Sequence, residues 1–144
     1  MKEERTPSTA SNAELARRCL GKDRFAAHCG IQLLSIASGH ARAKMELKPQ
    51  HWNGLGTVQG GAIFTLADFT FAAAANSHGT ISVALNVSIS FLKAAKTGTL
   101  WAEAREVSKG FKVGSYTIEV KDDEGAIVAI FQGVAYRKKD RLPG

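Results

Sequence analysis

One carboxylate stands alone in the most apolar part of this chain. Between Pro49 and Leu92, Asp68 is the only residue with a formal charge. Burying a carboxylate is costly unless it is paired or hydrogen-bonded, and the nearest candidate donor is Thr65, one helical turn earlier. Partial desolvation raises the basicity of such a group. The pattern therefore favours a catalytic carboxylate facing a cleft, with a strand-end cap or a partner of a distant lysine as the structural alternative.

Gln59, Gly60 and Gly61 offer a second chemical group before this carboxylate. The first N–H groups of a helix have no internal partner and lie at the positive end of the helix dipole. Glycine lets a substrate carbonyl approach that backbone closely. The segment therefore fits an oxyanion hole for acyl transfer, although a tight turn into a helix would use the same glycines.

The two groups are too far apart to act on one carbonyl from one chain. Gly60 and Asp68 are eight residues apart, which on a single helix is about 12 Å along the axis. A carboxylate and an oxyanion donor must both lie within a few ångströms of the carbonyl they serve. Two antiparallel helices of a symmetric pair would meet this requirement. The spacing therefore predicts a homodimer with its sites at the interface.

The helix that carries both groups is expected from Gly60 to Asn76. Alanine and leucine are abundant there, and no proline or internal glycine interrupts the segment. Its apolar residues cover every side, which predicts a helix buried all round. Only a sheet that curls around the helix could cover it to that extent.

Six strands are predicted from apolar or alternating segments bounded by turn residues. A short helix from Ser11-Asn12 to about Leu20 and a helical turn from Asp23 to His28 come before them. Regular turns between the last four strands favour an antiparallel meander. The fold class is thus α+β, an antiparallel six-stranded sheet wrapped around a long central helix. The strands are expected at 31–38, 40–47, 81–92, 99–107, 111–121 and 127–137.

Length and composition place these elements in one domain. The 144 residues, 44% of them hydrophobic, suit a single core. Residues 1–10 are predicted to be disordered, residues 11–138 to form the domain, and residues 139–144 to be a C-terminal tail. The net charge of +6 favours anionic partners, but no basic helix interleaved with aromatics indicates nucleic acid.

The segments at the start of the chain and around its cysteines indicate a cytoplasmic protein. Cys19 and Cys29 form no C-x-x-C pair and suit a reducing compartment. The polar start has no apolar core of a signal peptide. No apolar stretch reaches the length of a membrane span, so no membrane partner is expected.

Several segments agree, in order and spacing, with a known signature. They resemble the hot dog fold thioesterases, in particular the phenylacetic-acid-pathway (PaaI-like) type. The resemblance covers residues 20–138 and implies a hot dog fold and the hydrolysis of a small acyl- or aryl-CoA thioester. The matching segments are NGLGTVQGG at 53–61, FTLAD at 64–68, AN at 75–76, GI at 30–31, ISFLK at 89–93, GTL at 98–100 and KG at 109–110.

The resemblance also implies residue roles. Asp68 would be the nucleophile or general base, the backbone N–H of Gly60 would stabilise the oxyanion in the partner subunit's site, and Asn53 would orient water or substrate beside Asp68. It further implies no metal, no cofactor because CoA is part of the substrate, and a tetramer built from two dimers. Substrate- or CoA-binding positions are Gly61, Lys109, Gly110, Lys112 and Lys93, with Lys96 a further phosphate partner.

Gln59 is the one departure from the family pattern, which usually has histidine before the two glycines. A glutamine can donate a hydrogen bond to a thioester carbonyl but cannot carry a proton as histidine does. This leaves an acyl-CoA binder without turnover as the main alternative to an enzyme. A dehydratase on the same fold ranks last, because no histidine lies near the required helix positions.

Three further assignments stay open at this level. A hydroxyl on the strand after the helix has Ser82, Ser88 and Ser90 as candidates. His51 and His78 flank the proposed site and are read as surface or loop histidines. The aromatic residues that could line an acyl pocket, or simply belong to the core, are Trp52, Phe64, Phe69 and Phe71.

Overall fold

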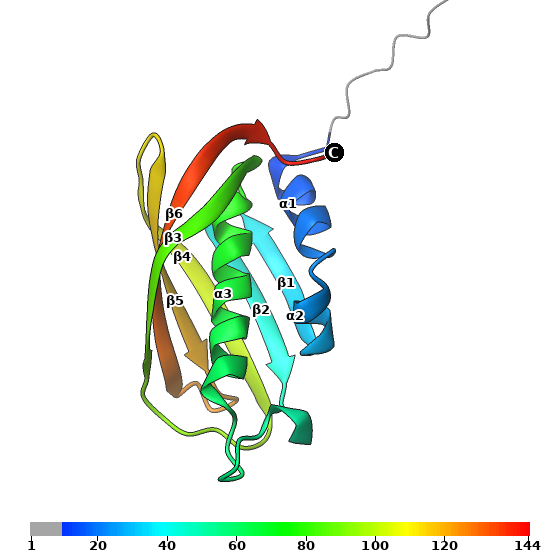
Figure 1. Cartoon of the computed structure of the whole chain (residues 1–144), viewed down its shortest axis with the longest axis vertical. Coiled ribbons are helices and arrows are strands. Elements are labelled where there is room, and N and C mark those ends of the chain that lie inside the picture. Colours follow the sequence, from blue (N-terminus) through cyan, green and yellow to red (C-terminus); the bar gives the residue numbers. More distant parts are fainter. Residues whose placement is uncertain (1–9) are drawn as a thin grey trace, which may run out of the picture.

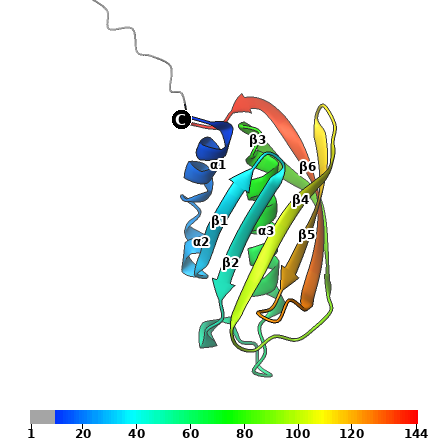
Figure 2. The same cartoon turned by 180° about the vertical axis from the view of Figure 1, so that it is seen from behind.

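A long helix, α3 (Gly60–Asn76), forms the axis of the fold. The structure, a computed structural model, describes residues 10–144. A six-stranded antiparallel sheet curls around α3 (Figures 1 and 2). Both the predicted bounds of this helix and the predicted fold class are confirmed. The predicted disordered segment 1–10 lies outside the described residues except for Ala10.

The six strands form one sheet in the order β1-β2-β4-β5-β6-β3. The predicted meander is wrong for β3, which pairs with β6 at the far edge, while β4 pairs with β2. The reason is that α3 separates β2 from β3 and crosses the concave face, so the chain re-enters the sheet on its opposite side. The strands are β1 (Ile31–Ala37), β2 (His40–Glu46), β3 (Thr80–Phe91), β4 (Thr99–Lys109), β5 (Val113–Lys121) and β6 (Ile127–Arg141).

The concave face of the sheet and one side of α3 make the core. Strand β5 shows the alternation of a half-covered sheet, with every second side chain buried. Met45 faces Leu100 across β2 and β4, and both side chains are fully buried. Phe71 of α3 packs against Tyr116 and Phe131 with ring centroids 5.4 and 5.6 Å apart. The core therefore fixes the rotation of α3 about its axis.

Two short helices cover the sheet beside β1. Helix α1 (Asn12–Leu20) begins at Ser11, whose side chain accepts a hydrogen bond from the Glu14 N–H at 3.1 Å. Helix α2 (Arg24–His28) begins at Asp23, which accepts from the Ala26 N–H at 2.9 Å. Both lie next to β1 in Figure 1. The two predicted helical segments are confirmed.

Strand β6 runs further than the sequence predicts. It continues to Arg141, which pairs with Thr80 of β3. The Leu142 N–H then donates to the Gly79 carbonyl at 2.9 Å, and the buried Leu142 side chain packs against Leu15. The charged residues before Leu142 are exposed. The hydrophobic periodicity of the sequence therefore did not predict that Leu142 would be buried and hold the C-terminal end of β6.

Helix α3 is not buried all round in a single chain. Gly61 is exposed, and Thr65, Asp68 and Ala72 are half-buried. These positions follow one another at helical spacing and form one stripe, here called the open stripe of α3. The sheet and the N-terminal helices cover the other sides of α3, so the open stripe is the part that a single chain leaves uncovered.

A polar cluster ties the C-terminal end of α3 to the sheet. His78 Nε2 donates to Glu106 Oε2 at 2.8 Å, and the Tyr116 hydroxyl donates to the same oxygen at 2.6 Å. Desolvation alone would raise the pKa of Glu106, but the hydrogen bonds from Tyr116 and His78 outweigh it and lower the pKa. His78 lies in the turn between α3 and β3, as the loop alternative of the prediction has it, and its side chain is a structural anchor.

Glu106→Gln is expected to destabilise the protein at neutral pH by about 1–3 kcal/mol, because it removes a charged acceptor shared by the buried Tyr116 and the partly buried His78. Because the pKa of Glu106 is lower in the folded protein than its unfolded value of 4.5, its ionised form stabilises the fold. This stabilisation is complete above the unfolded pKa and is lost as the pH falls through the folded pKa. The gap in melting temperature between wild type and variant should therefore shrink in acid. Thermal melts at several pH values between acid and neutral measure this difference in melting temperature, with Glu119→Gln as the control. A difference that does not change with pH would contradict the stabilising role of the Glu106 carboxylate.

Candidate active site

The first turn of α3 presents two unused backbone donors. Gln59 is the N-cap residue, with φ −64° and ψ 137°, and its carbonyl accepts from the N–H groups of Ala62 and Ile63 at 3.0 and 3.3 Å. Within residues 10–144, the N–H groups of Gly60 and Gly61 donate no hydrogen bond. They lie at the positive end of the helix dipole. This turn can therefore hold an anionic oxygen, as an oxyanion hole requires.

Side chains lie close to the backbone at both glycines. A Cβ on Gly60 would lie 3.1 Å from the ring Cζ of Phe91, and a Cβ on Gly61 would lie 2.5 Å from Oε1 of Gln59. The Gln59 side chain thus folds over Gly61 and makes no capping hydrogen bond. Its amide N–H₂ stays available to a ligand.

Asn53 organises the loop that leads into α3. Its side-chain carbonyl accepts from the N–H groups of Leu55 at 2.9 Å and Thr57 at 3.2 Å, and its amide donates to the Thr57 hydroxyl at 3.0 Å. Asn53 therefore lies at the Gly60 end of the helix. Its own chain does not bring it beside Asp68, which lies two helical turns further along.

His51 supports the same loop from beneath. Its Nδ1 accepts from the Lys48 N–H at 3.0 Å, so its Nε2 carries the proton and donates to the Cys29 carbonyl at 2.7 Å. The His51 side chain is buried, and the backbone carbonyl of His51 accepts a hydrogen bond from the Gln59 N–H at 2.8 Å. His51 lies in the loop before α3, as the loop alternative of the prediction has it, and it is buried there because both ring nitrogens have backbone partners.

Asp68 lies on the open stripe of α3. Within residues 10–144, its carboxylate makes no hydrogen bond or ion pair. The predicted bond from Thr65 is wrong, because that hydroxyl donates to the Gly61 carbonyl at 2.8 Å. Desolvation raises the pKa of Asp68, and the nearby negative charge of Asp23 raises it further. Such a carboxylate is a stronger base than an exposed one and is free to bind a ligand proton.

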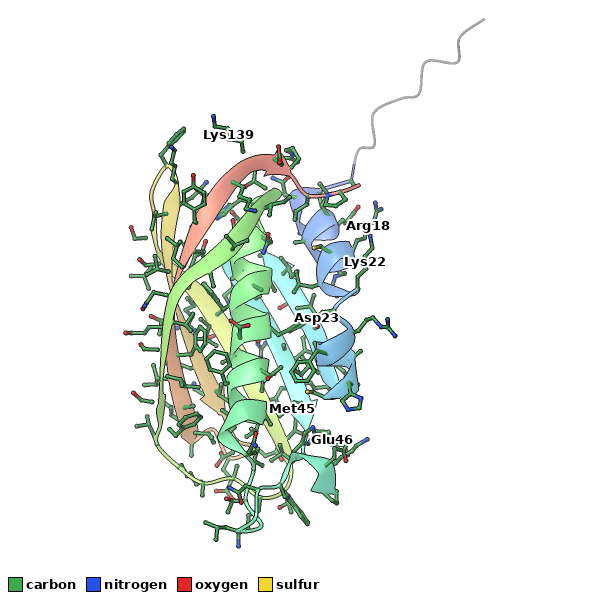
Figure 3. The ribbon with its side chains drawn as sticks, in the orientation of Figure 1. Arg18, Lys22, Asp23, Met45, Glu46 and Lys139 are labelled. Carbon is green, nitrogen blue, oxygen red and sulfur yellow. The ribbon has the colours of Figure 1, made fainter. Side chains whose placement is uncertain are left out.

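Asp23 is a neighbour of the site that sequence reasoning missed. Its role as the cap of α2 accounts for its presence in the sequence and gave no hint of a second role. Figure 3 shows Asp23 at the junction of α1 and α2, on the side toward α3. Only the packing of the N-terminal helices against α3 brings its charge near Asp68.

Two of the lysines predicted to bind CoA, Lys109 and Lys112, lie at the other end of the molecule from Gly60. Lys109, Gly110 and Lys112 form the exposed tip of the β4–β5 hairpin (Figures 1 and 2). Arg137 of β6 holds this tip by donating to the Gly110 carbonyl at 2.9 Å. Lys139 lies at the same end (Figure 3). This tip is thus a basic surface.

Lys93 is less available to a phosphate than the hairpin lysines. It follows β3 near the N-terminal end of α3 and pairs with Asp122, at 2.6 Å between Nζ and Oδ2. Lys96 is exposed, and its carbonyl accepts from the Trp52 indole at 2.9 Å. A single chain therefore places the predicted site residues at two ends, with Asp68 between them.

Two kinds of feature are absent from residues 10–144. No group of three or more His, Cys, Asp and Glu side chains that could hold a metal ion is present among them. No helix in this described part of the chain is long and apolar enough to cross a membrane.

Comparison with known proteins identifies the class. Residues 55–129 match the model of the thioesterase superfamily. A putative esterase of Archaeoglobus fulgidus is 36% identical over 94% of this chain and 92% of its own length. The acyl-coenzyme A thioesterase PaaI of Escherichia coli is 37% identical over 85% of this chain and 88% of its own. The chain therefore belongs to the thioesterase superfamily and is a member of its hot dog fold hydrolases.

Solved structures agree with this assignment. The Escherichia coli PaaI protein from the phenylacetic acid degradation operon superposes with a TM-score of 0.88 at 34% identity, covering 92% of this chain and 97% of that one. A Streptococcus mutans protein solved bound to acetyl CoA gives a TM-score of 0.74 at 28% identity, covering 77% and 90% of the two chains.

Proposed function

We propose that this protein is an acyl-CoA thioesterase of the PaaI type that hydrolyses a small acyl- or aryl-CoA ester to the carboxylic acid and CoA. The observation that carries the proposal is the half-buried Asp68 carboxylate, which has no partner in the described residues and lies on the open stripe of α3. The 37% identity to the Escherichia coli acyl-coenzyme A thioesterase supports the substrate class. The free cysteines, Cys19 and Cys29, fit a reducing cytoplasm.

Two routes lead from this carboxylate to the same products. In the first, Asp68 takes a proton from a water that attacks the thioester carbonyl, and the oxyanion collapses as the C–S bond breaks. In the second, Asp68 attacks the carbonyl itself, expels the CoA thiolate and leaves a mixed anhydride that water hydrolyses. In both routes, the Gly60 N–H of a partner subunit stabilises the oxyanion, and Asn53 of that subunit orients the water or substrate.

A symmetric dimer would complete the site. Strand β3 is an unpaired edge of the sheet with exposed apolar side chains, including Val83 at 40% and Leu85 at 59% of their accessible surface. Such an edge invites pairing with a second copy. Small residues on the open stripe, Gly61 and Ala72 among them, would let two α3 helices approach closely. Their antiparallel alignment would bring the partner's first turn of α3 toward Asp68.

The same arrangement would give the basic end of the molecule a function. The partner's first helical turn would lie at the end where the β4–β5 hairpin carries Lys109 and Lys112. The phosphates of CoA would then bind these lysines while the thioester reaches Asp68, with Gly61 and Gly110 leaving room for the ligand. Attraction of this kind weakens with added salt. We propose two such dimers in a tetramer.

A second candidate function is acyl-CoA binding without turnover. The feature that favours it is Gln59, whose side chain folds over Gly61 and cannot carry a proton. An amide donor at this position is still compatible with oxyanion stabilisation, because a hydrogen bond from the amide to the oxyanion requires no transfer of its proton. The enzyme is therefore the better-supported proposal.

We expect wild-type protein to release free thiol from a panel of acetyl-, hexanoyl-, benzoyl- and phenylacetyl-CoA. Release is followed with a thiol-reactive dye, and KM is expected to rise with added salt as the attraction to the basic hairpin is screened. CoA binding by calorimetry runs beside the assay. Tight CoA binding with no thiol release from any ester would contradict the proposed thioesterase activity and favour acyl-CoA binding without turnover.

A further inference from the structure

Arg137 of β6 holds the loop of the β4–β5 hairpin, residues 110–112, through all three of its backbone carbonyls. Nη1 of Arg137 donates to the Gly110 carbonyl at 2.9 Å and to the Phe111 carbonyl at 3.2 Å. The backbone N–H of Arg137 donates to the Lys112 carbonyl at 2.6 Å. One residue therefore binds every carbonyl of this loop.

Side-chain packing contributes little to the shape of the loop. The Phe111 side chain is 91% exposed, and Lys112 is exposed as well. Within the described part of the chain, the one further backbone hydrogen bond of the loop runs from the Gly110 N–H to the Val113 carbonyl at 2.8 Å. The hydrogen bonds from Arg137 are therefore the main constraint on the direction of the peptide groups in the loop.

The direction of the carbonyls decides the direction of the neighbouring N–H groups. Every peptide bond in the described residues is trans, and in a planar trans peptide the N–H points opposite to the C=O of the same unit. Because the carbonyls of Gly110 and Phe111 both point to one guanidinium nitrogen, the N–H groups of Phe111 and Lys112 both point away from it. Within residues 10–144, neither N–H donates a hydrogen bond. The outer side of the loop thus presents two consecutive backbone donors.

The charges around these two donors suit an anion. Lys109 and Lys112 lie directly beside them in the chain and are exposed, and their ammonium groups make no ion pair in the part that the structure describes. Lys138 and Lys139 follow Arg137 on β6 and are exposed too. Consecutive backbone N–H groups with ammonium groups beside them bind phosphate well, whereas a carbonyl turned outward would repel it.

We propose that Arg137 is a positioning residue for the phosphate groups of the CoA thioester. Its guanidinium binds the loop and not the ligand. By turning the loop carbonyls inward, it directs the N–H groups of Phe111 and Lys112 toward a phosphate that the lysine ammonium groups also attract. The inference rests on the proposed function. A loop already held in its binding conformation binds more tightly, because less order is imposed on association.

The substitution Arg137→Lys separates positioning from charge. Lysine keeps the positive charge but has no planar guanidinium to hold two carbonyls in a fixed geometry. In this variant, KM for phenylacetyl-CoA is expected to rise about 10-fold, the order of the cost of ordering a mobile loop side chain, with kcat unchanged. Phenylacetyl-pantetheine has no nucleotide, so its kcat/KM should not change. Arg105→Lys, at an exposed arginine of β4 that donates to the Glu103 side chain, is the matched control and should leave both substrates unaffected.

Binding measurements separate this proposal from the proposed activity. Calorimetry gives Kd for CoA without turnover, and Arg137→Lys should weaken it about 10-fold. Equal Kd values for wild type and variant, or equal losses of kcat/KM for the CoA and the pantetheine esters, would show that Arg137 does not position the loop. Weakened CoA binding in a protein that hydrolyses no thioester would overturn only the proposed activity.

A double-mutant cycle with Lys112→Met gives a second measurement on the same binding constant. If Arg137 acts through the loop, the effects of Arg137→Lys and Lys112→Met on Kd for CoA should be less than additive, because both disturb one phosphate contact. Strictly additive effects would mean that the two residues act independently and would contradict the positioning role.

Discussion

Asp68→Asn is expected to lower kcat for thioester hydrolysis by about 10²-fold or more, the usual effect of losing a general base, and to raise the melting temperature at the same time. Asparagine keeps the shape of the side chain and removes its charge. The thiol-release assay measures the first effect and calorimetric melting the second. Asp140→Asn, at an exposed carboxylate, serves as the control for the loss of one negative charge.

The stability gain follows from the direction of the Asp68 pKa shift. Desolvation and the charge of Asp23 raise the folded pKa above the ordinary value of 3.8. When the pKa of a carboxyl group is higher in the folded protein than in the unfolded chain, its protonated form stabilises the fold. This stabilisation is complete below the unfolded pKa and is lost as the pH rises through the folded pKa. At neutral pH the ionised carboxylate therefore destabilises the fold, and removing its charge relieves that cost.

The pH dependence makes this prediction specific. The melting temperatures of wild type and Asp68→Asn should converge in acid, where Asp68 is protonated in both folded and unfolded chains, and separate toward neutral pH. A variant that is inactive and less stable at every pH would indicate a structural carboxylate. Incorporation of labelled water oxygen into Asp68 during a single turnover would assign the nucleophilic route to the wild type.

A carboxylate and a helix were readable from the sequence because each has a local signature. Asp68 is conspicuous where a long segment has no other charge, and α3 ends where helix-forming residues give way to Ser77 and Gly79. The sheet order was not readable. The pairing of β3 with β6 depends on which edge the chain reaches after α3, and the turns between strands carry no information about that choice.

Contacts between distant segments account for the other differences. Asp23 and Asp68 belong to different helices, and His51 bonds to the Cys29 carbonyl across the base of the fold. The presence of Asp23 already has a sufficient local explanation in the sequence, because it caps α2. The residues of the candidate site that were predicted are those whose chemistry is unusual for their own segment, and those that were missed act through tertiary packing.

The substitution Gly60→Pro would remove the proposed oxyanion donor, the backbone N–H of Gly60, without removing any other hydrogen-bonding group. Proline lacks that group and is well tolerated at the first position of a helix. Gln59, with ψ 137°, already has the extended conformation that a residue before proline prefers. Gly60→Ala is the matched control, because it adds a Cβ against the Phe91 ring but keeps the N–H. We expect kcat of the proline variant to be about 10²-fold or more below that of the alanine variant.

Mixing two inactive variants then tests whether the site is shared between subunits. Asp68→Asn and Gly60→Pro each damage both sites of a homodimer. In a mixed dimer one site combines the two damaged groups, while the other takes Asp68 from one chain and Gly60 from its partner and is intact. Random assembly of equal amounts should therefore restore about a quarter of wild-type activity. If co-expressed, doubly tagged mixed dimers stay inactive, Asp68 and Gly60 do not act on one carbonyl across the interface. Restored activity would mean that the roughly 12 Å between them along one helix is bridged by symmetry.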